Sequence, residues 1–85
     1  MPTISMFYGI IIAMYYNDHN PPHIHAKYNE YEATIEIKTF KITGKLPANA
    51  KKLLKKWIKK NNNALLENWN LAKDGLPLKN VPPIE

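Results

Sequence analysis

The chain contains no cysteine and no arginine among its 85 residues. The lack of cysteine excludes disulfide bonds and thiolate metal sites, and is compatible with a reducing compartment. The longest apolar run covers residues 7–16, whereas a membrane-spanning helix needs about 20 apolar residues. The N-terminus also lacks a basic segment followed by a cleavage site, so no signal peptide is predicted. We therefore expect a cytoplasmic protein without a membrane partner.

Positive charge is unevenly distributed along the chain. All twelve basic residues are lysines, and the net charge is +5. Nine of these lysines lie between residues 38 and 60, a window without any Asp or Glu. A surface of one sign attracts nucleic acid or an acidic protein. The same pattern is also typical of a helix face that is only solvated.

The length limits the chain to one domain. At 85 residues, such a domain buries only about 60–65% of its extended surface. We expect a single α+β domain over residues 1–75 and a proline-rich extended tail, loosely held, over residues 76–85. With so small a core, a partner chain or a homo-oligomer would add stability.

Residues 7–16 form the most apolar segment. Its β-branched and aromatic residues predict one strand that is covered on both faces. Gly9 near its start indicates a bulge or the close approach of another element. Residues 39–43 predict a further short strand at the edge of the sheet, ended by Gly44.

Residues 23–37 predict a β-hairpin. With Asn29-Glu30 as the two-residue turn, the apolar side chains of the hairpin share one face. A shift of one residue would bury the charged side chains, so the pattern determines the register. The other face then carries the cross-strand pairs His23 with Glu36, His25 with Thr34, and Lys27 with Glu32.

The sequence after the sheet predicts helix. Pro47 opens it at a favoured first-turn position, and an apolar stripe from Ala50 to Ile58 faces the core. Lysines fill the opposite side: Lys51, Lys52, Lys55, Lys56, Lys59 and Lys60. A second helix follows Asn61-Asn62-Asn63 and ends at Asp74-Gly75, but one long helix is an alternative because the stripe continues almost in phase. The predicted fold is α+β, with a three- or four-stranded, mostly antiparallel sheet packed against one or two C-terminal helices.

All three histidines lie in residues 17–25, which we call the histidine corner. The double proline Pro21-Pro22 excludes helix and stiffens the turn. Histidines two positions apart on a strand point to the same face, and side chains from the preceding turn can converge on them. The candidate site residues are Asp18, His19, His23 and His25.

One interpretation of the histidine corner is a metal site. His23 and His25, joined by His19 or Asp18, would supply three ligands and leave one position open, as in catalytic zinc sites. A divalent metal at the histidines is the one cofactor that the sequence indicates.

A second interpretation is metal-free cleavage of RNA. The histidines would act as base and acid, because histidine titrates near neutral pH, and Lys27 or the lysine-rich helix would offset the phosphate charge. The third interpretation is structural. In that case His23 pairs with Glu36 and His25 with Thr34, while His19 caps the turn.

The sequence also resembles a family of small prokaryotic proteins of unknown function. The resemblance rests mainly on the motif DHNPPHIHA, residues 18–26, and extends over nearly the whole chain. The further matching segments are Met1–Ser5, Phe7–Ile10, Met14-Tyr15, Gly44–Pro47, Trp57 and Leu66–Trp69. Members of the family are often encoded beside a second small protein, in pairs that look like type II toxin–antitoxin modules. The resemblance implies a small cognate protein as partner, and no particular activity.

We therefore expect one component of a toxin–antitoxin-like pair, namely the toxin side, acting on RNA as an endoribonuclease through the histidine corner. The alternative is a non-catalytic binding module, antitoxin-like or regulatory, that binds a partner protein or nucleic acid through the lysine-rich helix. The expected nucleic-acid-binding residues are Lys27, Lys51, Lys52, Lys55, Lys56, Lys59 and Lys60.

Overall fold

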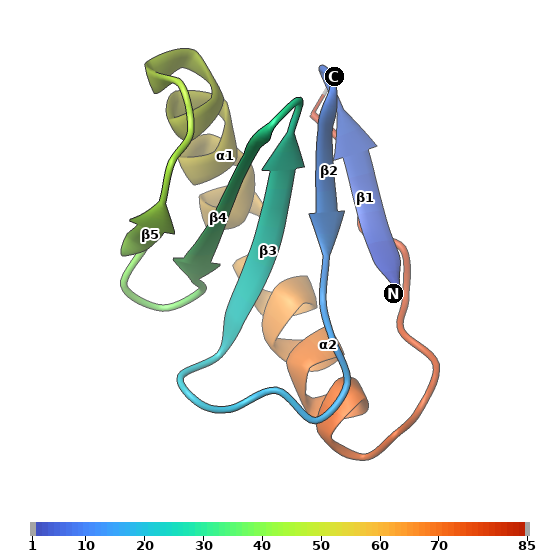
Figure 1. Ribbon diagram of the computed structural model, residues 1–85. Coiled ribbons are helices and arrows are strands. Elements are labelled where there is room, and N and C mark those ends of the chain that lie inside the picture. The colour runs from blue at the N-terminus through green and yellow to red at the C-terminus, as the bar shows by residue number, and fades with distance from the viewer. Residues whose placement is uncertain (1, 85) are drawn as a thin grey trace.

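The computed structural model describes residues 2–84, which form an antiparallel five-stranded sheet followed by two helices (Figure 1). The strands are β1 (Thr3–Phe7), β2 (Ile10–Ala13), β3 (His23–Tyr28), β4 (Tyr31–Glu36) and β5 (Ile42–Gly44). The helices are α1 (Ala48–Lys60) and α2 (Asn62–Lys73). Neighbouring strands in the sheet are also neighbours in sequence, in the order β1-β2-β3-β4-β5. The predicted α+β fold is confirmed.

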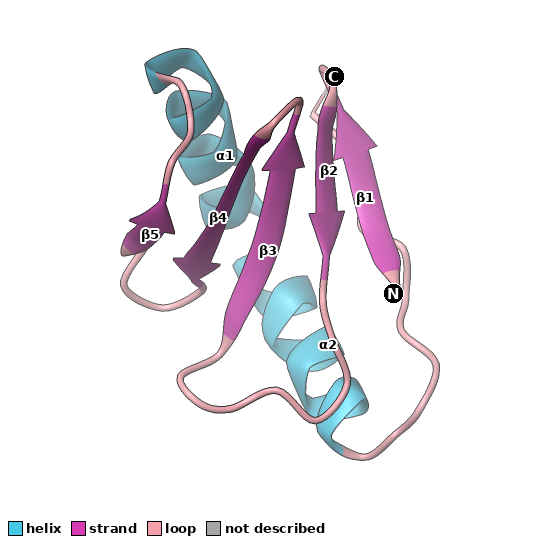
Figure 2. Ribbon diagram, viewed as in Figure 1, coloured by secondary structure: helices cyan, strands magenta, loops and turns pink. Residues whose placement is uncertain are grey.

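The sheet and the helices form two layers (Figure 2). Both helices lie against one face of the sheet, and the core fills the space between the layers. Alternation along β3 shows the two faces directly: Ile24 and Ala26 are fully buried, whereas Lys27 is exposed. Trp57 of α1 is the largest fully buried side chain, and its ring lies 5.2 Å from that of Phe7. The other sheet face, which carries His25 and Lys27, is open.

The first predicted strand is wrong. Residues 7–16 do not form one strand, because β1 ends at Phe7 and β2 begins at Ile10. Between them Tyr8 and Gly9 form a two-residue turn with φ of 49° and 80°, as hairpin turns of this length require. Gly9 therefore marks a turn rather than a bulge. The turn was not predicted because the residues on both of its sides are apolar. Because the turn divides this segment between two strands, the sheet has five strands rather than three or four.

The hairpin of β3 and β4 has the predicted register. His25 lies opposite Thr34, and Ile24 lies opposite Ile35. Asn29 opens the turn with φ of 52°, a conformation that asparagine tolerates well. The predicted edge strand exists as β5, shorter and later than residues 39–43.

Two helices form rather than one long helix. The break lies at Asn61, whose side-chain amide donates to the Trp57 carbonyl oxygen at 3.0 Å. Asn62 then donates to the Ile37 carbonyl oxygen at 2.7 Å, which attaches the junction to the end of the sheet. Among the described residues, no helix has the length and apolar character needed to cross a membrane.

The described part of the C-terminal tail, residues 76–84, contains no helix or strand. The expectation that it is loosely held is wrong, because several hydrogen bonds attach it to the domain. The buried Asn68 side chain donates to the Lys79 carbonyl at 2.8 Å and accepts from its N–H at 2.9 Å. The Trp57 indole donates to the Pro82 carbonyl at 2.8 Å. The N–H of Val81, a buried residue, donates to the Ile4 carbonyl at 2.8 Å, so the tail follows the free edge of β1 (Figure 1).

Candidate functional site

The histidine corner connects β2 to β3 at the end of the sheet near α2 (Figure 1). The Ile37 N–H donates to the Pro22 carbonyl oxygen at 3.0 Å, which attaches the corner to the chain after β4. The two prolines fix their own φ angles and restrict the residues before them. The corner is therefore stiff, and this backbone contact holds it in addition to the bonds made by the site side chains.

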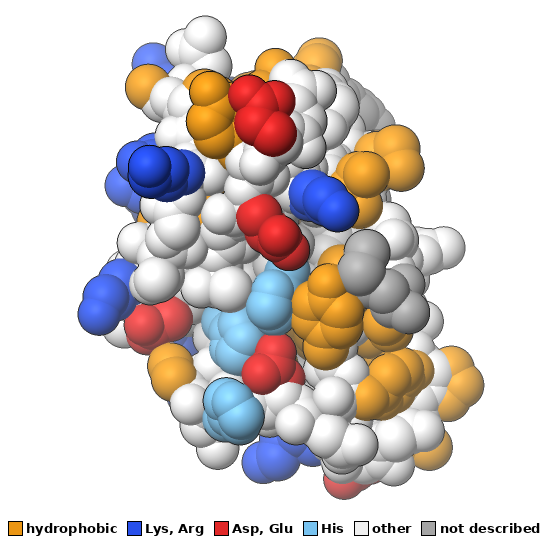
Figure 3. All heavy atoms as spheres, viewed as in Figure 1, with side chains coloured by type: hydrophobic (Ala, Val, Ile, Leu, Met, Phe, Trp, Pro, Cys, Tyr) orange, Lys and Arg blue, Asp and Glu red, His pale blue; other side chains and the backbone are white. Residues whose placement is uncertain are grey.

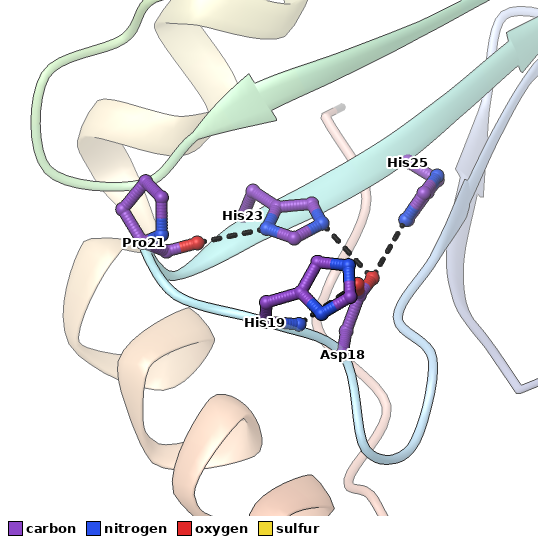
Figure 4. Close-up of polar contacts among 5 residues, drawn as sticks. All are labelled: Asp18, His19, Pro21, His23 and His25. Carbon is purple, nitrogen blue, oxygen red and sulfur yellow. Dashed lines mark hydrogen bonds and ion pairs between the residues drawn. The ribbon is translucent and has the colours of Figure 1, made fainter.

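Asp18 is the centre of the site (Figure 4). Its Oδ2 lies 2.9 Å from Nε2 of His23 and 3.1 Å from Nε2 of His25. Its Oδ1 accepts a hydrogen bond from the backbone N–H of His19 at 3.0 Å. One carboxylate oxygen thus fixes the turn and the other faces both imidazoles. We call Asp18, His23 and His25 the Asp-His-His cluster.

Both ring nitrogens of His23 are engaged. Nδ1 donates to the Pro21 carbonyl oxygen at 2.8 Å, because a carbonyl oxygen can only accept. Nε2 faces the Asp18 carboxylate, which is a second acceptor. A positive charge is therefore needed between Nε2 and Asp18, carried either by a second ring proton or by a bound cation. The ring also packs beside Trp69 of α2, with the centroids 5.2 Å apart.

His25 lies further along the same face of β3. The Tyr15 ring meets its ring edge-on at 4.4 Å. The side chain of His25 is 23% exposed and that of Asp18 is 19% exposed, so solvent reaches the cluster. A cavity of about 90 Å³ beside His25 is also lined by Lys27 and Glu32. The cluster thus borders a small hollow on the open face of the sheet.

The surroundings of Asp18 lower its pKa. Partial burial alone would raise the pKa of this carboxyl group. The hydrogen bonds from His25 and from the His19 backbone, together with the charge of His23, outweigh that effect, so the pKa lies below its ordinary value. Asp18 is consequently a carboxylate at neutral pH, as an imidazolium or metal partner requires.

His19 does not join the other two histidines. Its ring is exposed and makes no hydrogen bond with the other described residues, and only its backbone N–H reaches Asp18 (Figure 4). The side-chain pairs of the structural interpretation, His23 with Glu36 and His25 with Thr34, do not form either. His23 and His25 bind Asp18, while the Glu36 carboxylate accepts from Thr39 at 3.0 Å.

The predicted lysines lie in two separate places. Lys27 shares the open face with the cluster. The others lie on the exposed side of α1, whose buried side faces the opposite surface of the sheet. We call these six residues the lysine face: Lys51, Lys52, Lys55, Lys56, Lys59 and Lys60. On the open face itself, the histidines surround an acidic group and basic side chains are scattered among acidic ones (Figure 3).

Sequence reasoning missed three neighbours of the cluster. The Pro21 carbonyl oxygen, the Tyr15 ring and the Trp69 ring all contact its histidines. Tyr15 lies two residues before the histidine corner, so its position in the sequence could have indicated a contact with the histidines. Trp69 lies on a distant helix and the carbonyl belongs to the backbone, so residue types alone gave no sign of either.

The geometry distinguishes between two chemistries. An acid–base pair of histidines must approach the scissile phosphate from two sides. Here both Nε2 atoms face one carboxylate oxygen, and the potential ligand atoms of Asp18, His23 and His25 all lie within 4.8 Å of one another. This arrangement favours a single centre, formed by the three groups together, over a separate acid and base.

The comparisons with known proteins identify a family and no function. No curated protein and no solved structure matches the chain significantly. One family model matches residues 9–70, from the first hairpin turn into α2, and so includes the whole histidine corner. The chain belongs to this family, the domain of unknown function DUF4160.

Proposed function

We propose that the domain is an RNA-cleaving enzyme, the toxin side of a toxin–antitoxin-like pair, with the Asp-His-His cluster as its active centre. The observation that carries the proposal is the convergence of Asp18, His23 and His25 on one partly exposed point. Ionisable groups that meet in this way beside a hollow are candidates for catalysis. The stiff corner supports this interpretation, because it orients the groups before any substrate binds.

Charge supports RNA as the substrate. The chain carries a net charge of +5, which favours association with a polyanion. Lys27 lines the same hollow as His25 and would offset charge on a phosphate placed there. RNA also carries its own nucleophile, the 2′-hydroxyl group, next to each phosphate. A site with one activating centre is therefore sufficient for cleavage.

The proposed reaction is an internal transesterification. The cluster removes the proton from the 2′-hydroxyl, and the 2′-oxygen forms a bond to phosphorus. The bond from phosphorus to the 5′-oxygen then breaks, and water gives a proton to the leaving oxygen. The hydroxide that remains takes up the proton held by the cluster, which restores the site. The products are a 2′,3′-cyclic phosphate and a 5′-hydroxyl end. Replacement of the 2′-hydroxyl by hydrogen at the scissile position abolishes this reaction.

The test is cleavage of end-labelled single-stranded RNA by the purified chain. We expect His23→Ala and His25→Ala each to lower the rate by about 100-fold or more. Thr34→Ala is the matched control, because Thr34 lies opposite His25 on the same face but outside the cluster. The control should cleave like the wild type. Full activity in both folded histidine variants would refute the proposal.

The lysine face supports a second candidate function, binding of nucleic acid or an acidic protein. Its six lysines are exposed along one side of α1, and no acidic residue interrupts them. The triple variant Lys55→Glu, Lys56→Glu and Lys59→Glu should abolish this binding in a filter or gel-shift assay. Binding that persists in the triple variant and disappears in the histidine variants would contradict this alternative.

A further inference from the structure

We infer that the Asp-His-His cluster binds a divalent transition-metal ion, with water in the remaining coordination position. The ligand atoms are Oδ2 of Asp18 and the Nε2 atoms of His23 and His25. The inference goes beyond the proposed function, because it stands on the geometry and holds whatever the substrate is.

Two of the three separations between ligand atoms already lie near the required value, and the potential ligand atoms of the cluster all lie within 4.8 Å of one another. Oδ2 of Asp18 is 2.9 Å from one imidazole nitrogen and 3.1 Å from the other. Ligands about 2.0–2.2 Å from a tetrahedral zinc ion are about 3.3–3.6 Å from each other. At these two separations, a widening of roughly half an ångström is enough to admit the ion. Side-chain rotations of that size leave the backbone of the corner in place.

His23 is fixed in the tautomer that a metal ligand needs. The Pro21 carbonyl oxygen holds the proton on Nδ1, at 2.8 Å, so the lone pair of a neutral ring lies on Nε2. That lone pair points at Oδ2 of Asp18, another acceptor, at 2.9 Å. A cation between the two atoms removes this conflict. Backbone carbonyls orient metal-binding histidines in many proteins in the same way.

The remaining features agree with a site that an ion can enter. The His19 N–H holds Oδ1 of Asp18 at 3.0 Å, which leaves Oδ2 for the ion. The side chains of His23 and Asp18 are 15% and 19% exposed, so a water molecule can complete the coordination. Two imidazoles and one carboxylate, without thiolates, favour zinc and its first-row neighbours over calcium or magnesium.

The first experiment is a zinc titration of the full chain, purified without an affinity tag and freed of metal with a chelator. Calorimetry should show one zinc ion per chain. We expect His23→Ala and His25→Ala to weaken binding at least 100-fold. His19→Ala is the matched control, since it removes an exposed histidine next to Asp18 that contributes no ligand. The control should bind zinc with the affinity of the wild type.

The near-isosteric variants Asp18→Asn and His25→Gln keep the test valid if the alanine variants fold poorly. Cobalt provides a second readout, because a four-coordinate Co²⁺ ion absorbs visible light and this absorption should disappear in His25→Gln. A folded wild-type chain that binds no zinc would overturn the inference. The inference would also be overturned if His19→Ala lost as much affinity for zinc as His23→Ala and His25→Ala.

The outcomes also separate this inference from the proposed function. Stoichiometric zinc binding by a protein that leaves RNA intact would uphold the metal site and refute RNA cleavage. Cleavage by a chain that binds neither zinc nor cobalt would refute the metal site and uphold RNA cleavage.

Discussion

The ionisable side chains of the histidine corner converge on one point, whereas those of the lysine face are spread over an exposed helix surface. In the corner, three side chains within eight consecutive positions turn toward one another, and backbone groups hold two of them. On α1, six lysines point away from the sheet into solvent. A converged cluster suits chemistry at one atom, whereas a dispersed face suits salt-dependent attraction. The chain thus separates a candidate reaction centre from a candidate attractive surface, on different sides of the molecule.

The largest expected effect separates the two regions kinetically. Under the proposed function, the double variant His23→Ala/His25→Ala should lower kcat for RNA cleavage by about 1,000-fold, since it removes the groups that would act in the transition state. Reversal of three charges on the lysine face should instead raise KM and leave kcat within about threefold. Steady-state initial rates over a range of RNA concentrations measure both. A loss of kcat in the lysine variant would contradict the separation.

The next effect concerns salt. The proposed binding of single-stranded RNA through the lysine face would release counterions, so its affinity should fall as salt rises. Alanine at Lys55, Lys56 and Lys59 should reduce the slope of log K against log salt by about 2, given a change of about 0.7 per phosphate contact. The double histidine variant should keep the wild-type slope. An unchanged slope in the lysine variant would show that RNA binds elsewhere.

A smaller effect concerns pH and the corner alone. The folded-state pKa of Asp18 lies below its ordinary value of 3.8, so its interactions stabilise the fold above that pH. This stabilisation is lost as the pH falls through the folded-state pKa. The difference in unfolding free energy between the wild type and Asp18→Asn should therefore shrink as the pH is lowered from about 5 to about 2.5. Urea unfolding with a chelator present measures it, and a constant difference would count against the prediction.

The smallest effect is expected on the lysine face. Lys51 is exposed and belongs to a helix, and alanine is a good helix former. Lys51→Ala should change the unfolding free energy by less than about 0.5 kcal/mol. Thermal and urea unfolding test this. A loss of several times that size would reveal a structural role for a side chain that we assign to attraction alone.

The sequence predicted the second half of the sheet better than the first. In residues 23–37, apolar and polar residues alternate, so only one register buries the right side chains, and His25 lies opposite Thr34 as expected. Around Tyr8 the residues are apolar on both sides of the turn, and this removed the contrast that locates a turn. The helix break at Asn61 was one of two alternatives, because the apolar stripe crosses it.

The sequence predicted where the candidate cluster lies in the chain and only some of its members. The double proline and the spacing of His23 and His25 indicated a stiff corner with two histidines on one face, and both are found in the cluster. The choice between Asp18 and His19 depended on the backbone path through the turn. No pattern of residue types determines such a path, since either side chain could have pointed toward the strand.

The contact between the tail and β1 has a consequence for assembly. An edge strand with free backbone groups is a template on which another chain can add a strand. Here the Val81 N–H occupies the Ile4 carbonyl, and the Trp57–Pro82 bond holds the tail beside that edge. A chain shortened before Val81 would present an uncovered edge and should self-associate through it, which light scattering would detect as dimers or larger species. We therefore expect the tail over residues 76–84 to hinder β-pairing between chains at this edge.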